Sequence, residues 1–556
     1  MASDGVLSLI ITAAVCGVLG YAAGQVLADD ADSDSAYRRG AVVSEARTKP
    51  DRKRSRRAGG EERGAADHFS PLTLAGLPVA AEDEAKHFKF IGTTGTGKST
   101  AIREMLSAAL ARGDRAVIAD PDGGYLNHFY NADRGDVILN PFDRDSVKWN
   151  LLGEITTDPD VDQLARSLIP DGGGSDRSWN GYARTFFTAI TQQALAARVQ
   201  DDGEIYRLIT KAPVTELKLL LAGTVAGPFL EDANDRMFGS VRSVTSSAVG
   251  ALKYTTQQRA APFSVRQWVR QGAAVKNGGR GGVLFLPYKA GEIAALRSVI
   301  SAWMRMAIFE AMDRGEGDQR LWFVVDELDA LGEIDGLKDA LARLRKFGGR
   351  CVLGFQSISQ VSSTYGKGAA DTIVENCGNT LILRCSASEQ GGTSQFASRL
   401  IGQREVVHTS RSETRRPGDF RASTTTSEQR SIEPAIMASE IERLPDLEGF
   451  LKFASVPDWM RVTLTPVTYP VVARPRRPDT APRMPTPDGA APVAAAEAAP
   501  RPANPSRGVK SRTAIRKRTR PSKTEIAPSS GAMGETPGVR GTGPSPDDEH
   551  AKRVET

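Results

Sequence analysis

GTTGTGKS, from Gly92 to Ser99, is the stretch of sequence that decides the fold class of this chain. It matches the pattern GxxxxGK[ST] in full. Glycines let the backbone of such a loop curl, so that its N–H groups point at phosphate oxygens. The apolar run His87–Ile91 predicts a strand before it, and apolar residues at helical spacing from Ile102 to Leu110 predict a helix after it. A strand, this loop and a helix in succession are the context of a P-loop.

A P-loop predicts a site for ATP and Mg²⁺. The Lys98 ammonium can reach the β- and γ-phosphates, and the Ser99 hydroxyl can ligate magnesium. The positive end of the following helix dipole adds to the attraction for phosphate. The residues expected to bind the nucleotide are Gly92, Thr93, Thr94, Gly95, Thr96, Gly97, Lys98, Ser99 and Thr100.

The second part of such a site is an acidic pair at the end of the apolar run LWFVVDE, residues 321–327. A P-loop needs a carboxylate that holds magnesium and a base that orients the attacking water. We expect Asp326 to hold the metal, directly or through water, and Glu327 to polarise the water. The alternative is a surface turn with two acids, and the P-loop in the same chain favours catalysis. Asp120 and Asp122 follow another predicted strand, where a turn-forming role competes with a metal or base role.

Two further polar residues are candidates for the same site. Gln356 follows the strand predicted at 351–355, and the carboxyl ends of parallel strands line one crevice, so we expect it to sense the γ-phosphate. The alternative is an ordinary polar residue at a strand end. Arg345 ends a helix whose leucine stripe leaves it free to reach outward, and in a ring it could enter a neighbour's site as an arginine finger. The alternative is a solvated arginine, and the basic residues that compete for the role are Lys346, Arg350 and Arg384.

The distribution of apolar runs along the chain predicts an α/β fold with a parallel sheet. Strand-like runs disappear between 157 and 272, where helical spacing predicts an all-α insertion. Few aromatics and many Pro, Ala, Arg and Ser residues predict a disordered tail from about 475. The expected segments are 1–28, a transmembrane anchor; 29–75, a juxtamembrane linker; 76–156 and 273–474, the two parts of the nucleotide-binding domain; 157–272, the insertion; and 475–556, the basic tail.

The N-terminal run Val6–Ala28 carries no charge, and about 20 apolar residues span a bilayer as a helix. A cleavable signal peptide is the alternative, with Val26-Leu27-Ala28 as a cleavage site. No basic residue precedes the run, which favours a retained, single-pass anchor in the inner membrane. The basic segment from Arg38 to Arg57 predicts that the bulk of the chain faces the cytoplasm.

The composition of the whole chain says little about partners, because a hydrophobic content of 40%, a charged content of 25% and a net charge of +5 are ordinary for a globular protein. The four cysteines and five histidines show no ligand spacing, so neither a disulfide framework nor a zinc site is predicted. The tail segment 501–523 has Lys and Arg residues but no acid, which suits contact with DNA or a relaxosome. Solubility or attraction to anionic lipid is the alternative.

Several long motifs resemble those of the TraD/TrwB-type coupling proteins of bacterial conjugation. They are GTTGTGKS, VVDELDALGEIDGL, RKFGGRCVLGFQSISQV and GGVLFLPYKAGEIAALRSVISAWMRMAI, together with NPFD and WNLL near 140–152. The similarity covers roughly residues 37 to 470, and these motifs in the same order are more specific than the P-loop alone. Segregation and resection translocases share the P-loop and the acidic strand but not this set.

The resemblance implies a RecA-like P-loop NTPase that forms a homo-hexameric ring, with the all-α insertion facing the relaxosome and DNA passing through the channel. In such proteins a P-loop lysine, an Asp-Glu pair, an arginine and a glutamine act in catalysis, and here these are Lys98, Asp326, Glu327, Arg345 and Gln356. The implied partners are DNA, the relaxase and other relaxosome proteins, and components of the type IV secretion channel. Many members have two spans with a periplasmic loop, whereas one span is found here, so the contacts of such a loop are not carried over.

Two other functions remain open at this point. The chain could be a membrane receptor that docks nucleoprotein or effector cargo, with nucleotide switching its assembly. It could also be a segregation-type DNA translocase. The motif set favours an ATP-driven DNA translocase that couples the relaxosome to a type IV secretion channel.

Overall fold

The computed structural model describes residues 34–46, 71–172, 176–272, 282–315, 320–388, 392–414 and 423–472. All of them belong to one compact unit of the chain. The anchor predicted at 1–28 and the disordered tail predicted at 475–556 lie outside these ranges. Among the helices formed by the described residues, none is both long enough and apolar enough to cross a membrane.

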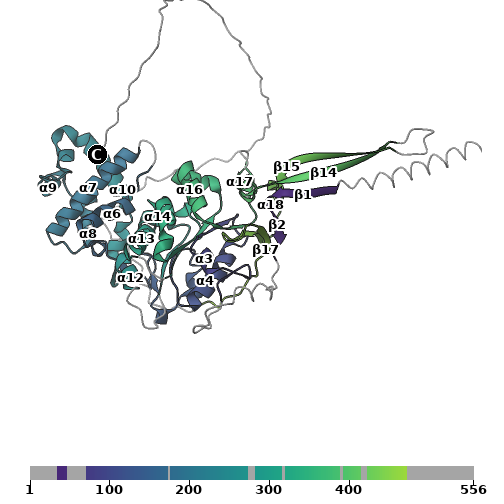
Figure 1. Ribbon diagram of the computed structural model, residues 1–556. Coiled ribbons are helices and arrows are strands. Elements are labelled where there is room, and N and C mark those ends of the chain that lie inside the picture. The colour runs from purple at the N-terminus through teal and green to yellow at the C-terminus, as the bar shows by residue number, and fades with distance from the viewer. Residues whose placement is uncertain are drawn as a thin grey trace, which may run out of the picture. The chain divides into compact units, whose positions relative to one another are not determined.

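A ten-stranded mixed sheet forms the centre of the fold (Figure 1). In spatial order its strands are β2 (Val43–Glu45), β17 (Trp459–Thr463), β16 (Glu448–Lys452), β13 (Asn379–Ile382), β5 (Phe88–Ile91), β12 (Gly349–Phe355), β11 (Leu321–Val325), β6 (Arg115–Pro121), β10 (Val283–Tyr288) and β7 (Val137–Ile138). The strands from β13 to β7 run parallel, whereas β16 is antiparallel to both of its neighbours. The predicted α/β fold is confirmed, and β12 separates the P-loop strand β5 from β11.

The central strands are continuous apolar runs because helices cover both faces of the sheet. Every residue of β5, β10 and β11 is buried. On one face lies α4 (Lys98–Ala111), and on the other α13 (Ile293–Asp313), each contributing to a separate hydrophobic cluster. The other helices around the sheet are α3 (Ala81–Glu84), α5 (Leu126–Phe129), α14 (Leu337–Leu344), α15 (Ile358–Tyr365), α16 (Lys367–Asn376), α17 (Gly392–Ile401) and α18 (Ala438–Glu442).

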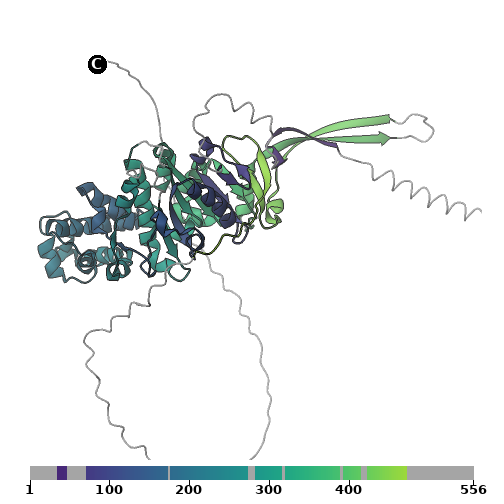
Figure 2. The ribbon, with the colours of Figure 1, turned by 90° about the horizontal axis from the view of Figure 1, so that it is seen from below.

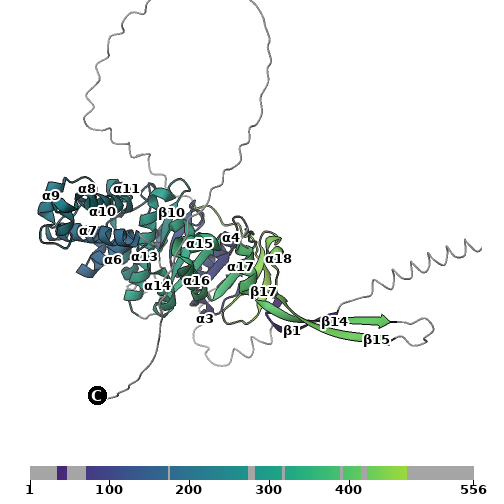
Figure 3. The same ribbon diagram turned by 90° about the horizontal axis from the view of Figure 1, so that it is seen from above.

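The range 157–272 is almost entirely helical, as its spacing predicts. Its helices, grouped together in Figure 3, are α6 (Asp158–Leu168), α7 (Asp176–Ala196), α8 (Asp202–Thr210), α9 (Val214–Leu220), α10 (Asp235–Ala248), α11 (Leu252–Gln257) and α12 (Val265–Gln271). One short strand, β9 (Pro262–Phe263), pairs with β8 (Lys148–Trp149). Helices α6 and α12 pack against α13, so the helical core is continuous with one face of the sheet. The limits assigned to the segments stay predictions.

A separate three-stranded sheet consists of a long hairpin with a third strand beside it (Figure 2). The hairpin is β14 (Gln403–Thr414) with β15 (Ser423–Pro434), and β1 (Asp34–Gly40) pairs antiparallel with β14. Strands β1 and β2 therefore lie in the range 29–75, where the sequence predicted a linker. The sequence of β1, DSAYRRG, is polar and has no apolar pattern that would predict a strand. The strand is held by its backbone pairing with β14 and by the ion pairs of Arg38 and Arg39 with Glu405. Two short strands, β3 (Thr73–Leu74) and β4 (Leu77–Pro78), form a hairpin of their own.

Candidate nucleotide site

The P-loop connects β5 to α4 at the carboxyl edge of the sheet. The Gly92 N–H donates to the Phe355 carbonyl at 3.1 Å, and the Thr93 N–H donates to the Arg384 carbonyl at 2.9 Å. These acceptors follow or end β13 and β12, the two neighbours of β5. The start of the loop is therefore fixed to the strands on both sides.

Two glycines give the loop its curl. Gly95 and Gly97 have φ angles of +81° and +120°, a region that side chains with a Cβ rarely adopt. A Cβ on Gly97 would also lie 3.0 Å from the side chains of Leu447 and Leu464. The backbone thus has the shape that phosphate binding requires of this pattern.

The Lys98 ammonium lies inside the loop. It is only 6% exposed and donates to the carbonyl oxygens of Gly92 at 2.6 Å and Thr93 at 3.1 Å. Burial lowers the pKa of Lys98, whereas the charges of Asp326 and Glu327 act in the opposite direction. A charged phosphate oxygen is a stronger acceptor than a carbonyl, so it can replace these partners.

Asp326 joins the P-loop to β11. The Ser99 hydroxyl donates to Asp326 Oδ2 at 2.6 Å, and the Tyr125 hydroxyl donates to the same oxygen at 2.7 Å. The other oxygen, Oδ1, is buried and has no hydrogen-bond partner. Leaving a buried acceptor unsatisfied is costly, and a cation would satisfy it.

The Asp326 carboxylate and the Ser99 hydroxyl suit a magnesium ion that is also bound by phosphates, rather than a metal held by protein ligands alone. Among the described residues there is no cluster of three or more His, Cys, Asp and Glu side chains that could hold a metal. Mg²⁺ characteristically binds through one or two carboxylates together with substrate phosphates and water. Asp326 and the hydroxyl of Ser99 supply the protein part of such a set.

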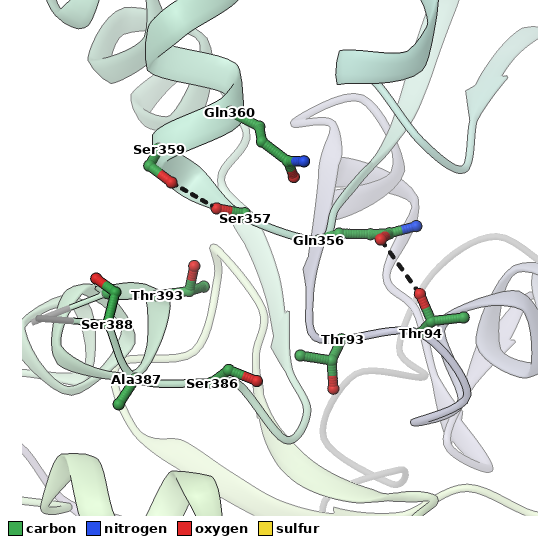
Figure 4. A pocket seen from close by; sticks show the side chains of 11 residues that line it. Thr93, Thr94, Gln356, Ser357, Ser359, Gln360, Ser386, Ala387, Ser388 and Thr393 are labelled. Atoms are coloured by element: carbon green, nitrogen blue, oxygen red, sulfur yellow. Dashed lines mark hydrogen bonds between the residues drawn. The ribbon is translucent and has the colours of Figure 1, made fainter. Parts of the chain in front are cut away.

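Gln356 joins the P-loop to Glu327. Its Nε2 donates to Glu327 Oε1, and the Thr94 hydroxyl donates to Gln356 Oε1 at 3.2 Å (Figure 4). This is possible because β12 ends between β5 and β11. Burial raises the pKa of Glu327, and the negative charge of Asp326 raises it further. The P-loop, the acidic pair and Gln356 converge at one edge, as their positions at strand ends predict.

A polar pocket of about 400 Å³ opens beside this group (Figure 4). Its lining residues are Thr93, Thr94, Gln356, Ser357, Ser359, Gln360, Ser386, Ala387, Ser388, Gly392 and Thr393. None of these side chains is ionisable, and neither Lys98 nor the acidic pair belongs to the lining. The pocket therefore borders the site on its Thr93–Thr94 side without being the catalytic centre.

Arg345 lies at the opposite edge of the sheet. It is exposed, follows α14 and precedes β12, whose far end carries Gln356. At about 3.3 Å a residue, this strand spans roughly 20 Å. Its neighbour there is His87, at the start of β5, whose pKa the Arg345 charge helps to lower. Arg345 is therefore not brought to the site of its own chain.

The competing basic residues have partners or face solvent. Arg384 Nη2 binds Asp446 Oδ1 at 2.6 Å, and Arg350 Nε binds Glu84 Oε2 at 3.4 Å. Lys346 is exposed beside Arg345, away from the P-loop. Arg384 nevertheless takes part in the site through its carbonyl, which anchors the P-loop.

Asp120 forms the turn after β6. Its two carboxylate oxygens accept the N–H groups of Tyr125 at 3.0 Å and Leu126 at 2.7 Å. Burial raises the pKa of Asp120 to about 7. The turn-forming interpretation accounts for these contacts.

Two tyrosines at this edge were not predicted from the sequence. Tyr125 and Tyr288 are 1% and 4% exposed, and Tyr125 bonds directly to Asp326. In the sequence, each resembles an ordinary core aromatic. The one signal that could have identified them is position, because Tyr288 ends a predicted strand and Tyr125 follows shortly after another.

Comparison with known families gives one match over most of the chain. The model of a family described as the type IV secretion-system coupling protein DNA-binding domain matches residues 71–465. The coupling protein TraD of Escherichia coli (strain K12) is 29% identical over 407 residues, which cover 73% of this chain and 56% of TraD. The chain thus matches little more than half of the length of that relative.

Solved structures of the plasmid coupling protein TrwB share the fold. One, in complex with the non-hydrolysable ATP analogue ADPNP, has a TM-score of 0.65 at 28% identity and covers 79% of this chain and 96% of its own. Another, in complex with ADP and Mg²⁺, has a TM-score of 0.64 at 28% identity, with coverages of 78% and 95%.

Proposed function

The chain belongs to the family of the type IV secretion-system coupling protein DNA-binding domain, and from this premise we propose that it is a membrane-anchored ATPase that moves DNA from a relaxosome into a type IV secretion channel during conjugation. The observation that carries the proposal is the 2.6 Å hydrogen bond from Ser99 to Asp326, because it unites the P-loop with the acidic strand end. The TraD and TrwB relatives, both coupling proteins, support it.

ATP and Mg²⁺ are the proposed ligands, supported by the complexes of TrwB with ADPNP and with ADP and Mg²⁺. The loop from Gly92 to Thr100 would surround the phosphates with backbone N–H groups. Lys98 would exchange its carbonyl partners for phosphate oxygens, and Ser99 and Asp326 would hold the metal. Bound magnesium supplies positive charge against the phosphate oxygens.

Glu327 is the proposed base for the attacking water. A carboxylate with a raised pKa takes a proton more readily than an exposed one, which suits this role. Gln356 holds Glu327 and also receives the Thr94 hydroxyl, so a phosphate at Thr94 would compete for the same amide. This gives Gln356 a physical route to sense the γ-phosphate.

Arg345 would act in a neighbouring copy within a homo-hexameric ring. Its distance from the P-loop of its own chain and its exposure support this arrangement. Mixing Lys98→Ala with Arg345→Ala chains tests it, because mixed rings would contain sites with an intact Lys98 beside a neighbour's intact Arg345. We expect ATP turnover to return on mixing, and two variants that stay inactive together would contradict the arrangement.

The proposed location is the inner membrane, with a single span at residues 6–28 and the bulk of the chain in the cytoplasm. The proposed partners are DNA, the relaxase and other relaxosome proteins, and components of the type IV secretion channel. Alkaline extraction and protease protection of membranes from producing cells test the location, and a chain released by alkali would contradict it.

Glu327→Gln is the variant that tests the proposed function. It should bind ATP but not hydrolyse it, so we expect loss of both turnover and DNA transfer between cells. If transfer continues at the normal frequency, nucleotide only switches a docking platform, and the translocase proposal is wrong. Scoring chromosome segregation in cells without the gene distinguishes a segregation-type translocase.

A further inference from the structure

The edge of the sheet that carries the P-loop also holds a tyrosine with no assigned role. Tyr288 is the last residue of β10, and its carbonyl accepts the Asp122 N–H at 2.8 Å. Strand β10 lies beside β6, which lies beside β11, the strand that leads to the acidic pair. Tyr288 is therefore two strands away from Glu327, which is about 10 Å between backbones.

The register of these strands shows which face of the sheet Tyr288 occupies. Val325 pairs with Ala119, and Ala119 pairs with Leu286, so the three side chains stand in one row and belong to one hydrophobic cluster. Tyr288 follows this row by two residues within β10, and alternate residues of a strand share a face. Glu327 follows Val325 by two residues, just beyond the end of β11. Asp326, one position earlier, is directed to the opposite face, where Ser99 on α4 binds it.

The Tyr288 hydroxyl is buried without a hydrogen-bond partner, although the residue is only 4% exposed. Oδ1 of Asp326 and Oδ1 of Asp329 are buried and unpaired as well. Burial and the negative charges of Glu327, Asp326, Asp120 and Asp329 raise the pKa of Tyr288, and the effect of Glu327 is the largest among these charges. The hydroxyl is thus a donor with carboxylates around it and no bond to any of them.

Gln356 is the side chain that holds Glu327. Its amide donates to Glu327, while its carbonyl oxygen accepts the Thr94 hydroxyl of the P-loop. A phosphate bound along the loop would draw Thr94 and Gln356 toward itself, since charged oxygens are stronger acceptors. Glu327 would then lose its only side-chain donor among the described residues, with the Tyr288 hydroxyl at the same edge of the sheet.

We propose that Tyr288 is a positioning residue for Glu327: its hydroxyl takes over the carboxylate from Gln356 when nucleotide is bound and holds it in place toward the attacking water. This inference rests on the proposed function, in which Glu327 is the base. Tyr288 does not exchange a proton with the water. It fixes the orientation of the group that does.

Tyr288→Phe removes only the hydroxyl, so it tests the inference in the full-length chain. We expect kcat for ATP to fall about tenfold, as is typical when the partner that orients a functional group is lost. The KM for ATP and the affinity for a fluorescent ATP analogue should stay unchanged, because the hydroxyl does not contact the nucleotide. The melting temperature without nucleotide should stay the same or rise, because the removed hydroxyl has no partner.

Tyr365→Phe is the matched control. Tyr365 is half-buried, and its hydroxyl donates to the Gly332 carbonyl and accepts the Ile334 N–H, both at 3.2 Å. We expect this variant to melt at a lower temperature and to keep its kcat. Tyr288→Phe should therefore lower turnover without lowering stability, and Tyr365→Phe should lower stability without lowering turnover.

The outcomes separate this inference from the proposed function. An inactive Glu327→Gln with a normal kcat for Tyr288→Phe overturns the role of Tyr288 and leaves the translocase proposal intact. A Tyr288→Phe variant that loses kcat and melting temperature together has a structural defect, which also overturns the role. A Glu327→Gln variant with normal turnover overturns both.

Discussion

The two edges of the central sheet are both buried and both rich in charge, but they differ in how well that charge is satisfied. At the amino edge, Glu84 accepts two hydrogen bonds from Arg112, each 2.7 Å long, and a second cation, Arg350, lies 3.4 Å away. Arg112 also binds Asp114. At the carboxyl edge, atoms of Asp326, Asp329 and Tyr288 are buried without a partner.

The difference teaches which edge serves stability and which serves ligand binding. The pairing of Glu84 and Asp114 with arginines at the amino edge keeps the desolvation cost of these buried charges low. Unpaired buried groups at the carboxyl edge lower stability, and such groups are retained where a ligand satisfies them. Changes at the amino edge should therefore lower stability, whereas changes at the carboxyl edge should lower turnover.

Lys98→Ala should give the largest effect. We expect ATP turnover to fall about 1,000-fold, or about 4 kcal/mol, because a preorganised donor to the phosphates is lost. Stability should not fall, since the buried ammonium has only carbonyl acceptors. The matched control is Lys89→Met, because Lys89 is also buried and donates only to backbone carbonyls, those of Val374 and Cys377. Normal turnover by Lys98→Ala would remove the contrast between the edges.

Glu84→Ala should give the next largest effect, on stability alone. We expect the free energy of unfolding to fall by about 3 kcal/mol, because Arg112 and Arg350 lose a buried partner while Arg112 keeps Asp114. Urea unfolding measures this, and ATP turnover per folded molecule should stay normal. Glu82→Ala, an exposed acid on the same helix, is the control and should change neither. Loss of turnover without loss of stability would contradict the assignment of this edge.

The free energy of unfolding should also depend on pH, through His87 at the amino edge. Burial lowers the pKa of His87 to about 4, and its Nδ1 accepts the Cys351 N–H at 3.0 Å, which requires the neutral ring. Below pH 6.5 the unfolded chain binds this proton and the folded chain does not, so stability falls as the pH falls from 7 toward 4. The share of His87 is about 2 kcal/mol between pH 7 and 5. Urea unfolding at several pH values should show that the free energy of unfolding depends less on pH in His87→Asn than in the unmodified chain. An equal pH dependence in the two proteins would contradict the prediction.

Tyr125→Phe should give the smallest effect. Its hydroxyl is one of two donors to Asp326 Oδ2, and Ser99 remains as the other. We expect a loss of about fivefold in turnover, equal to the roughly 1 kcal/mol of one hydrogen bond. Steady-state kinetics at varied Mg²⁺ should show the loss most clearly at low Mg²⁺, and an unchanged Mg²⁺ dependence would mean that Tyr125 does not orient Asp326.

The central sheet and the convergence of its strand ends could be predicted from sequence for a physical reason. Strands buried on both faces are continuous apolar runs, and polar residues that end such runs stand out, as Gln356 does after Phe355. The three-stranded sheet could not be predicted, because the side chains described in β14 and β15 are mostly exposed and the sequence of these strands follows no apolar alternation. It forms by pairing between Asp34–Gly40 and β14, in which Arg38 and its partner Glu405 are 367 residues apart in the chain.

The tyrosines of the site were missed for a related reason. In sequence, Tyr288 is the end of the buried run VLFLPY and cannot be told from a core residue. Only the strand order shows that this run ends two strands from Glu327. Arg345 is separated from its own P-loop by the length of β12, because it precedes the amino end of that strand and the P-loop lies at the carboxyl end.

The most direct test is the ATP turnover of the purified full-length chain with and without DNA, with Lys98→Ala measured in parallel. The account predicts low turnover without DNA, a clear rise when DNA is added, and none in the variant under either condition. Turnover that is indifferent to DNA, or that persists without the Lys98 ammonium, would contradict the claim that this edge of the sheet drives DNA movement.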